Sequence, residues 1–281
     1  MFQKILYALL LLMMPLMILA KDMDPGSAYL QDYLRTRADL SGNETVFHFT
    51  GGVYSLIPGQ KSMQLFAVDG YNISRLQKAE VGYQLLGKEV MLLLDHRTKE
   101  ILGTWRNPFT GESTPVLHIL NDPTNQSFVY EPEMLPYISS MLPSIKLDES
   151  TIYHSEIFPF YPHVLPRREY NAYVQSDSFQ AAEITEYRVR NEALVDRSIL
   201  CVPAEYNMSY ISPWLPFMRM SDRAGQLLFV VRGEKLEGGF AALPPALKGY
   251  IFTHHTDFSQ APTIWTEPNQ DPWSYFKELT E

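Results

Sequence analysis

The sequence predicts a mainly β fold, either a single antiparallel β-barrel of the lipocalin or calycin kind or a closed sandwich, with a short N-terminal helix and a short C-terminal helix. One observation is a series of short runs rich in β-branched and aromatic residues, separated by Gly, Pro, Asn or Asp. Another is that no strand-helix-strand alternation, repeat or Gly/Ser linker divides the chain. The 281 residues, 46% of them hydrophobic, are enough for one substantial core.

The N-terminal helix is expected to begin at Asp24-Pro25 and to run toward Leu40, because aspartate caps a helix and proline suits its first turn. A second short helix is expected from Leu243 to about His254. Between them lie the expected strands: 46–49, 52–57, 64–68, 81–94, 100–106, 114–120, 170–174, 181–189, 198–202 and 226–232.

Turns and irregular segments follow from the polar and proline-rich stretches. Residues 95–100 and 107–112 read as turns between strands, and Gly87 could mark a bend in the long strand 81–94. Residues 131–166 carry six prolines and cannot be regular sheet throughout. We expect this segment to be an excursion that packs over the scaffold or a lid over a pocket.

Residues 1–20 resemble a signal peptide, because Lys4 precedes an apolar run that ends at Ala20 and charged Lys21 follows. A retained anchor is the alternative. We expect residues 21–281 to form one domain with no stable membrane span.

Four asparagines each begin an N-x-[ST] sequon: Asn43, Asn72, Asn125 and Asn207. These sequons favour glycosylation in a eukaryotic secretory route. The alternative is a periplasmic bacterial protein in which these triplets have no meaning.

Composition and motifs exclude several classes of function. A net charge of -9 argues against nucleic acid as a partner, and a single cysteine, Cys201, rules out an intrachain disulfide. Serine-hydrolase, nucleotide-binding, zinc-protease and dithiol signatures are absent. His254 and His255 are adjacent and lack a partner at ligand spacing, so we expect no metal and no cofactor.

Polar residues inside apolar strands are the catalytic candidates. His118 alternates with Val116 and Leu120, and Glu89 and Glu183 interrupt two other strands. A buried histidine beside either carboxylate would form an acid-base pair or a structural network, and each residue alone could also face solvent.

Residues 212–220 are expected to form an irregular aromatic loop that either plugs one barrel end or forms a wall of an apolar ligand pocket. The candidates for substrate binding in this loop are Trp214, Phe217 and Met218.

A series of motifs spanning about residues 46–277 resembles the family catalogued as domain of unknown function 1838. It includes TWRNPFTGE at 104–112, VLHILNDP at 116–123 and the 268–277 segment PNQDPWSYFK. The resemblance draws attention to His118, Asn121 and Asp122, and we count Asn121 and Asp69 among the substrate-binding candidates. The chain departs from the family where Gly87-Lys88-Glu89 replaces a usual S-R-E and where Asp69 replaces a usual glutamate.

These observations predict a secreted enzyme that performs cofactor-independent acid-base chemistry on an apolar or aromatic metabolite, as a lyase, isomerase or cyclase of a biosynthetic or catabolic pathway. His118 would be the general acid or base, with Glu89 or Glu183 orienting it. The alternative is a non-catalytic, lipocalin-like carrier of a small hydrophobic ligand. A structural envelope protein is a third possibility, and it would need no cavity.

Overall fold

The computed structural model describes residues 25–128, 133, 137–220 and 223–281. The expected signal peptide, residues 1–20, lies outside this part of the chain. The described strands are β1 (Glu44–Leu56), β2 (Gln64–Lys78), β3 (Tyr83–Leu94), β4 (Thr104–Arg106), β5 (Ser113–Pro115), β6 (Ile119–Asn121), β7 (Gln126–Phe128), β8 (Ser144–Lys146), β9 (Ser150–Ile157), β10 (Phe160–Pro162), β11 (Ser178–Gln180), β12 (Ala182–Arg190), β13 (Glu205–Ser212) and β14 (Gln226–Lys235). The helices are α2 (Pro25–Arg37), α3 (Ile138–Met141), α4 (Arg167–Tyr170), α5 (Asn191–Val195), α6 (Pro245–His254) and α7 (Pro272–Thr280), with 3-10 turns η2 (Pro216–Met218), η3 (Gly239–Ala242) and η4 (Thr256–Ser259).

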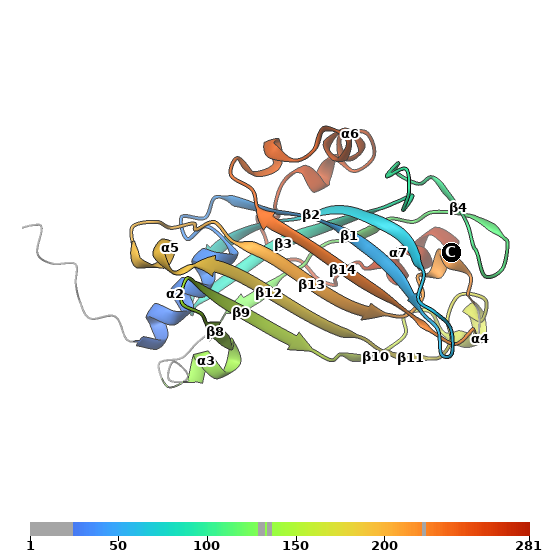
Figure 1. Ribbon diagram of the computed structural model, residues 1–281, viewed down its shortest axis with the longest axis horizontal. Helices are drawn as coiled ribbons and strands as arrows, with labels where there is room; N and C mark the ends of the chain where they lie inside the picture. The colour runs from blue at the N-terminus through green and yellow to red at the C-terminus, as the bar shows by residue number, and fades with distance from the viewer. Residues whose placement is uncertain (1–24, 129–132, 134–136, 221–222) are drawn as a thin grey trace, which may run out of the picture.

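A large antiparallel sheet dominates the molecule (Figure 1). Within the described chain its strand order is β6-β3-β2-β1-β14-β13-β12-β9-β8, and β7 also pairs with β3. The mainly β, antiparallel prediction is therefore confirmed. No pairing between described strands joins β8 to β6 or β7, each of which is three residues long. The expected closed barrel is not formed by these pairings.

Both faces of the sheet are buried at β3, which explains its continuous apolar run. Leu85, Met91 and Leu93 pack in the larger core cluster on the inner face, whereas Val90 and Leu92 pack in a second cluster on the outer face. Successive side chains of a strand point to opposite faces, so a strand covered on both sides needs apolar residues at every position.

Different helices cover the two faces. The outer cluster contains Leu247 and Ile251 of α6, and Figure 1 shows α6 above β1 and β2. The inner cluster contains Leu34 of α2 and Trp273 of α7. In Figure 1 these two helices lie toward opposite ends of the long axis. The inner face is thus bounded by a helix at each end.

Glycines allow close approach of the central strands. A Cβ atom on Gly51 would lie 2.0 Å from the carbonyl oxygen of Val230, and one on Gly233 would lie 1.9 Å from that of His48. Only a residue without a side chain fits where two backbones come this close. These glycines therefore fix the contact between β1 and β14, at the middle of the sheet.

The proline-rich segment differs from the expectation. Of residues 131–166, the described part contributes β8 and β9 to the main sheet, and β10 pairs with β11. It is therefore not a separate lid. The reason is that Pro143 precedes β8 and Pro159 follows β9, so the pairing positions of β9 keep their N–H donors, and Pro162 is the last residue of the short β10.

Two expected strands, 170–174 and 198–202, are wrong. Residues 170–174 form a turn in which the amides of Tyr173 and Val174 both donate to the carbonyl of Tyr170. The backbone of residues 198–202 forms hydrogen bonds with the N-terminal helix and the residues after it instead of with a strand: Val202 N donates to Arg35 O, and Leu200 O accepts from Leu40 N. The two expected helices are present as α2 and α6, and α7 is an additional helix.

Candidate functional site

The inner face of the sheet encloses a cavity of about 400 Å³. Residues from both arms of the sheet line it, since Glu89 lies on β3 and Glu183 on β12. Arg37 of α2 and Trp273 of α7 line it too. Its other polar lining side chains include Asn72, Asn121, Tyr187, Tyr206, Tyr210 and Asp271. The lining is therefore mixed, with aromatic walls and a set of ionisable groups.

Glu89 is held by the strand pairs on either side of it. In the register of the sheet it lies opposite Asn72 on β2 and Asn121 on β6. The Nδ2 atom of Asn121 donates to Glu89 Oε1 at 3.0 Å. This amide fixes one oxygen of the carboxyl group and leaves the second for the cavity.

The pKa of Glu89 is raised from its ordinary value to about 7. Burial is the largest cause, because desolvation disfavours the charged form, and the negative charge of Glu183 adds to it. The Asn121 hydrogen bond and the positive charge of Arg37 act in the opposite direction. A carboxylic acid with this pKa can give or take a proton near neutral pH.

Glu183 approaches from the opposite arm of the sheet. It pairs with Tyr210 on β13 and Ile157 on β9, and its Oε1 accepts from Thr185 Oγ1 at 3.0 Å. Its charge raises the pKa of Glu89 across the cavity. The sheet thus brings together two carboxyl groups that are 94 positions apart in the sequence.

Arg37 and two tyrosines complete the polar centre. The guanidinium of Arg37 donates to Tyr187 Oη and, at 3.2 Å, to Gln126 Oε1, and its Cζ lies 4.2 Å from the centre of the Tyr187 ring. Burial raises the pKa of Tyr187 and that of Tyr206. It also raises the pKa of Tyr210 to about 12. These phenols therefore keep their protons at neutral pH and act as neutral hydrogen-bonding groups.

His118 is not part of this site, and its expected pairing with Glu89 or Glu183 is wrong. It belongs to the opposite face of the sheet, where its ring is edge-on to that of Tyr250 with centroids 5.2 Å apart. Its Nδ1 accepts a hydrogen bond from Leu93 N at 3.0 Å. Burial, followed by the charges of His255 and His254, lowers its pKa to about 4. These surroundings favour the neutral form of His118 and place its ring in the packing of the outer face.

The aromatic loop is part of the core. Trp214, Phe217 and Met218 are all buried, and Phe217 packs against Phe66 and Trp105. None of the three lines the cavity that contains Glu89; Trp214 instead borders a separate pocket of about 170 Å³. The structure therefore does not bring these three expected substrate contacts into the cavity of Glu89 and Glu183.

The remaining candidates separate into cavity and surface positions. Asn121 lines the cavity as expected, whereas Asp69 forms an ion pair with His48 at 2.7 Å in a half-buried position away from it. Asn72 also lines the cavity and is half-buried, and its Nδ2 donates to Thr124 Oγ1 at 3.3 Å. Asn43 is exposed; Asn125 and Asn207 are half-buried.

In the described part of the chain, no group of three or more His, Cys, Asp or Glu side chains gathers in a way that could hold a metal ion. None of the helices in the same residues has the length and apolar character needed to cross a lipid bilayer.

The fold and the cavity define a class: a curled antiparallel sheet around one polar and aromatic internal site. Residues 42–280 match the family model described as "Protein of unknown function (DUF1838)", and the chain belongs to this family. Searches of curated proteins and of solved structures give no match.

Sequence reasoning overlooked Arg37, Tyr187 and Tyr206. Tyr187 lies in the expected strand 181–189 and Arg37 in the expected N-terminal helix, but neither was a candidate; Tyr206 lies in β13, which no expected strand covered. One signal was available: Arg37 occupies the last turn of an expected helix next to apolar Leu34 and Ala38, which both turn out to be fully buried. A charge on the buried side of a helix points to an internal partner.

Proposed function

We propose that this protein is an enzyme that transfers protons on a small molecule in the cavity, with Glu89 as the general acid and Glu183 as the general base. The observation that supports it most is the pair itself. Two carboxyl groups face one cavity, and the pKa of Glu89 is raised to about 7, partly by the charge of Glu183. Enzymes commonly separate acid and base roles between two carboxyl groups in this way.

The proton balance of such a reaction is simple. Glu183 accepts a proton from a C–H or O–H group of the substrate, and the released electron pair moves through the substrate's conjugated system. Glu89 donates its proton to the atom where the negative charge collects. This completes an isomerisation; in a lyase the newly protonated group leaves, and in a cyclase the electron pair forms the ring bond. Proton exchange with water then restores both residues.

The substrate fits the mixed lining. Tyr206, Tyr210, Phe229 and Trp273 supply aromatic surface, which suits an aromatic or alicyclic body, and Asn121 supplies a polar contact beside Glu89. This reading keeps the lyase, isomerase or cyclase expectation and moves the acid-base role from His118 to the two glutamates.

Deuterium exchange tests the proposal without knowledge of the natural substrate. The protein is incubated in D2O with a panel of aromatic ketones and lactones, and loss of C–H signals is followed by proton NMR. We expect accelerated exchange in at least one compound and a decrease of about 10²-fold in Glu89→Gln and Glu183→Gln. The control is Glu186→Gln, whose side chain is on the other face of β12. Exchange that is unaffected by both cavity variants contradicts the proposal.

The same panel distinguishes the carrier alternative. A carrier needs the aromatic walls but not a carboxyl group that titrates near neutral pH. Saturable binding of panel compounds in calorimetry, without any exchange above the buffer rate, would assign the cavity to transport or storage instead of catalysis.

We also propose that the chain works in the secretory pathway or outside the cell, or in the periplasm of a bacterium. Support comes from the Lys4 and apolar 5–20 pattern and from the exposed sequon at Asn43. Mass spectrometry of the secreted protein should find an N-terminus within a few residues of Lys21 and, from a eukaryotic host, a glycan on Asn43. A mature protein that starts at Met1 contradicts this location.

A further inference from the structure

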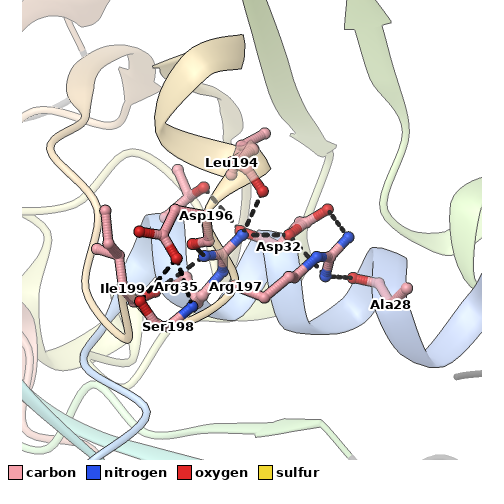
Figure 2. A network of polar contacts seen from close by, with 9 residues as sticks. Ala28, Asp32, Arg35, Leu194, Asp196, Arg197, Ser198 and Ile199 are labelled. Carbon is pink, nitrogen blue, oxygen red and sulfur yellow. Dashed lines mark hydrogen bonds and ion pairs between the residues drawn. The ribbon is translucent and has the colours of Figure 1, made fainter. Parts of the chain in front are cut away.

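Two buried arginines of α2 differ in how their charge is compensated. Arg35 donates to the carbonyl oxygens of Asp196, Ile199 and Leu194 at 2.7 to 2.9 Å, and forms an ion pair with Asp32 at 2.7 Å. Figure 2 shows this network at the side of α2 that faces α5 and the loop after it. Arg35 is therefore a structural residue whose charge is paired within the fold.

Arg37 is also buried, with 8% of its surface exposed, but its partners are neutral. They are the hydroxyl of Tyr187, the amide oxygen of Gln126 and Tyr33. Arg37 takes part in none of the ion pairs among the described residues, so no carboxylate oxygen of these residues lies within 4 Å of its guanidinium nitrogens. Its Nε has no hydrogen-bond partner among them.

A buried guanidinium without an adjacent anion is costly, because arginine does not lose its proton and desolvation disfavours its charge. The space next to Arg37 is the cavity that holds Glu89 and Glu183. A planar guanidinium matches the two oxygens of a carboxylate in shape and charge. The missing counter-charge can therefore be supplied by a ligand.

We infer that the cavity takes a ligand with a carboxylate or similar anionic oxygen group, which Arg37 holds at the α2 end, while the ligand body extends along the aromatic wall toward Trp273 of α7. This deepens the proposed function, on which it rests for the role of the cavity, by naming the chemical class of the substrate. Arg37 is a substrate-positioning residue in this scheme. The bound anion also favours the protonated form of Glu89, the form that a general acid needs.

Calorimetry with two matched probes, 2-naphthoate and 2-naphthamide, tests the inference on the full-length protein. The probes have nearly the same shape and differ in charge. We expect the protein to prefer 2-naphthoate by roughly tenfold or more at pH 6.5, as for a hydrogen-bonded charge pair. Arg37→Gln should abolish the preference by weakening only 2-naphthoate, and Arg37→Lys should restore part of it because it keeps the charge but loses the fork.

The controls separate this inference from the proposed function. Arg190→Gln removes an exposed arginine and should leave both affinities unchanged. Glu89→Gln should retain the preference for 2-naphthoate while deuterium exchange is lost. Equal affinities of the two probes, binding of neither, or a preference that persists in folded Arg37→Gln overturns the inference, even if exchange still depends on Glu89. Circular dichroism establishes folding of each variant.

Discussion

Glu89 links the chemistry of the cavity to the stability of the fold. Burial favours the protonated form of its carboxyl group, and one carboxyl oxygen accepts a hydrogen bond from Asn121. Ionisation then has to occur against burial and against the charge of Glu183. Ionising such a buried carboxyl group costs free energy, and this cost raises its pKa into the range that is useful for proton transfer. The same free energy can be measured without a substrate, because it makes the stability of the fold depend on pH.

The first prediction concerns the pH dependence of unfolding. The folded-state pKa of Glu89, about 7, exceeds its ordinary value of 4.5, so the folded protein keeps a proton that the unfolded chain releases. The unfolding free energy should therefore fall as pH rises from 4.5 to 7, by on the order of 2 to 3 kcal/mol. Urea denaturation at pH 5 and pH 8 should show a smaller fall in Glu89→Gln than in the parent. An equal fall in both contradicts the raised pKa.

The second prediction is that substitution of His118 lowers the stability of the fold and leaves catalysis unchanged. His118→Leu removes the acceptor of the buried Leu93 N–H, which should cost about 1 to 3 kcal/mol of unfolding free energy. His118→Gln, which can still accept from Leu93, should lose less. Deuterium exchange by the folded variants should match the parent. A loss of exchange without a loss of stability would return His118 to the site.

At the level of elements, α7 begins with an Asp-Pro pair, a local sequence signal for the start of a helix. Asp271 caps this helix by accepting from Trp273 N at 3.0 Å and Ser274 N at 2.7 Å, and Pro272 occupies its first turn. Asp24-Pro25 is the same pair of residue types, and it correctly predicted α2. No helix was expected after the second pair, although proline is compatible with the first turn of a helix.

The third prediction follows from this cap. Asp271→Ala should lower the unfolding free energy by about 1 kcal/mol, whereas Asp271→Ser should be close to the parent because serine can accept the same backbone hydrogen bonds. Since α7 carries Trp273 into the cavity, Asp271→Ala should also weaken binding of the neutral probe 2-naphthamide. Thermal and urea denaturation measure the first effect, and calorimetry the second. Equal stability of Asp271→Ala and Asp271→Ser contradicts a capping role.

At the scale of the whole molecule, the sequence could predict β1 to β5, β12 and β14 and their alternation, but it missed β9 and β13 and did not show which face would be the inside. Glu89 and Glu183 were identified as candidates because each interrupts an apolar strand, and Asn121 because of the family resemblance; all three line the cavity. His118 met the same criterion on the opposite face. Alternation cannot separate the two cases when α6 buries the outer face as well.

Long-range packing explains the other differences. Arg37 joins the site through the placement of α2, and Glu183 faces Glu89 through the curvature of the sheet. The sequence around Arg37 indicates a buried charge, but no local pattern identifies the partner in either contact. Trp214 and Phe217 were read as ligand-binding aromatics, but they fill the core beside Trp105, since large apolar side chains are more often buried against each other than against a ligand.

The most direct test of this account is the ionisation of Glu89 itself. Carbon-13 NMR of protein labelled at the glutamate side-chain carboxyl carbon follows each group through a pH titration, and Glu89→Gln identifies the relevant signal. The account predicts a midpoint near pH 7 that falls in Glu183→Gln, because the neighbouring negative charge is gone. A midpoint near 4.5, unchanged by Glu183→Gln, would contradict a shared acid-base site in the cavity.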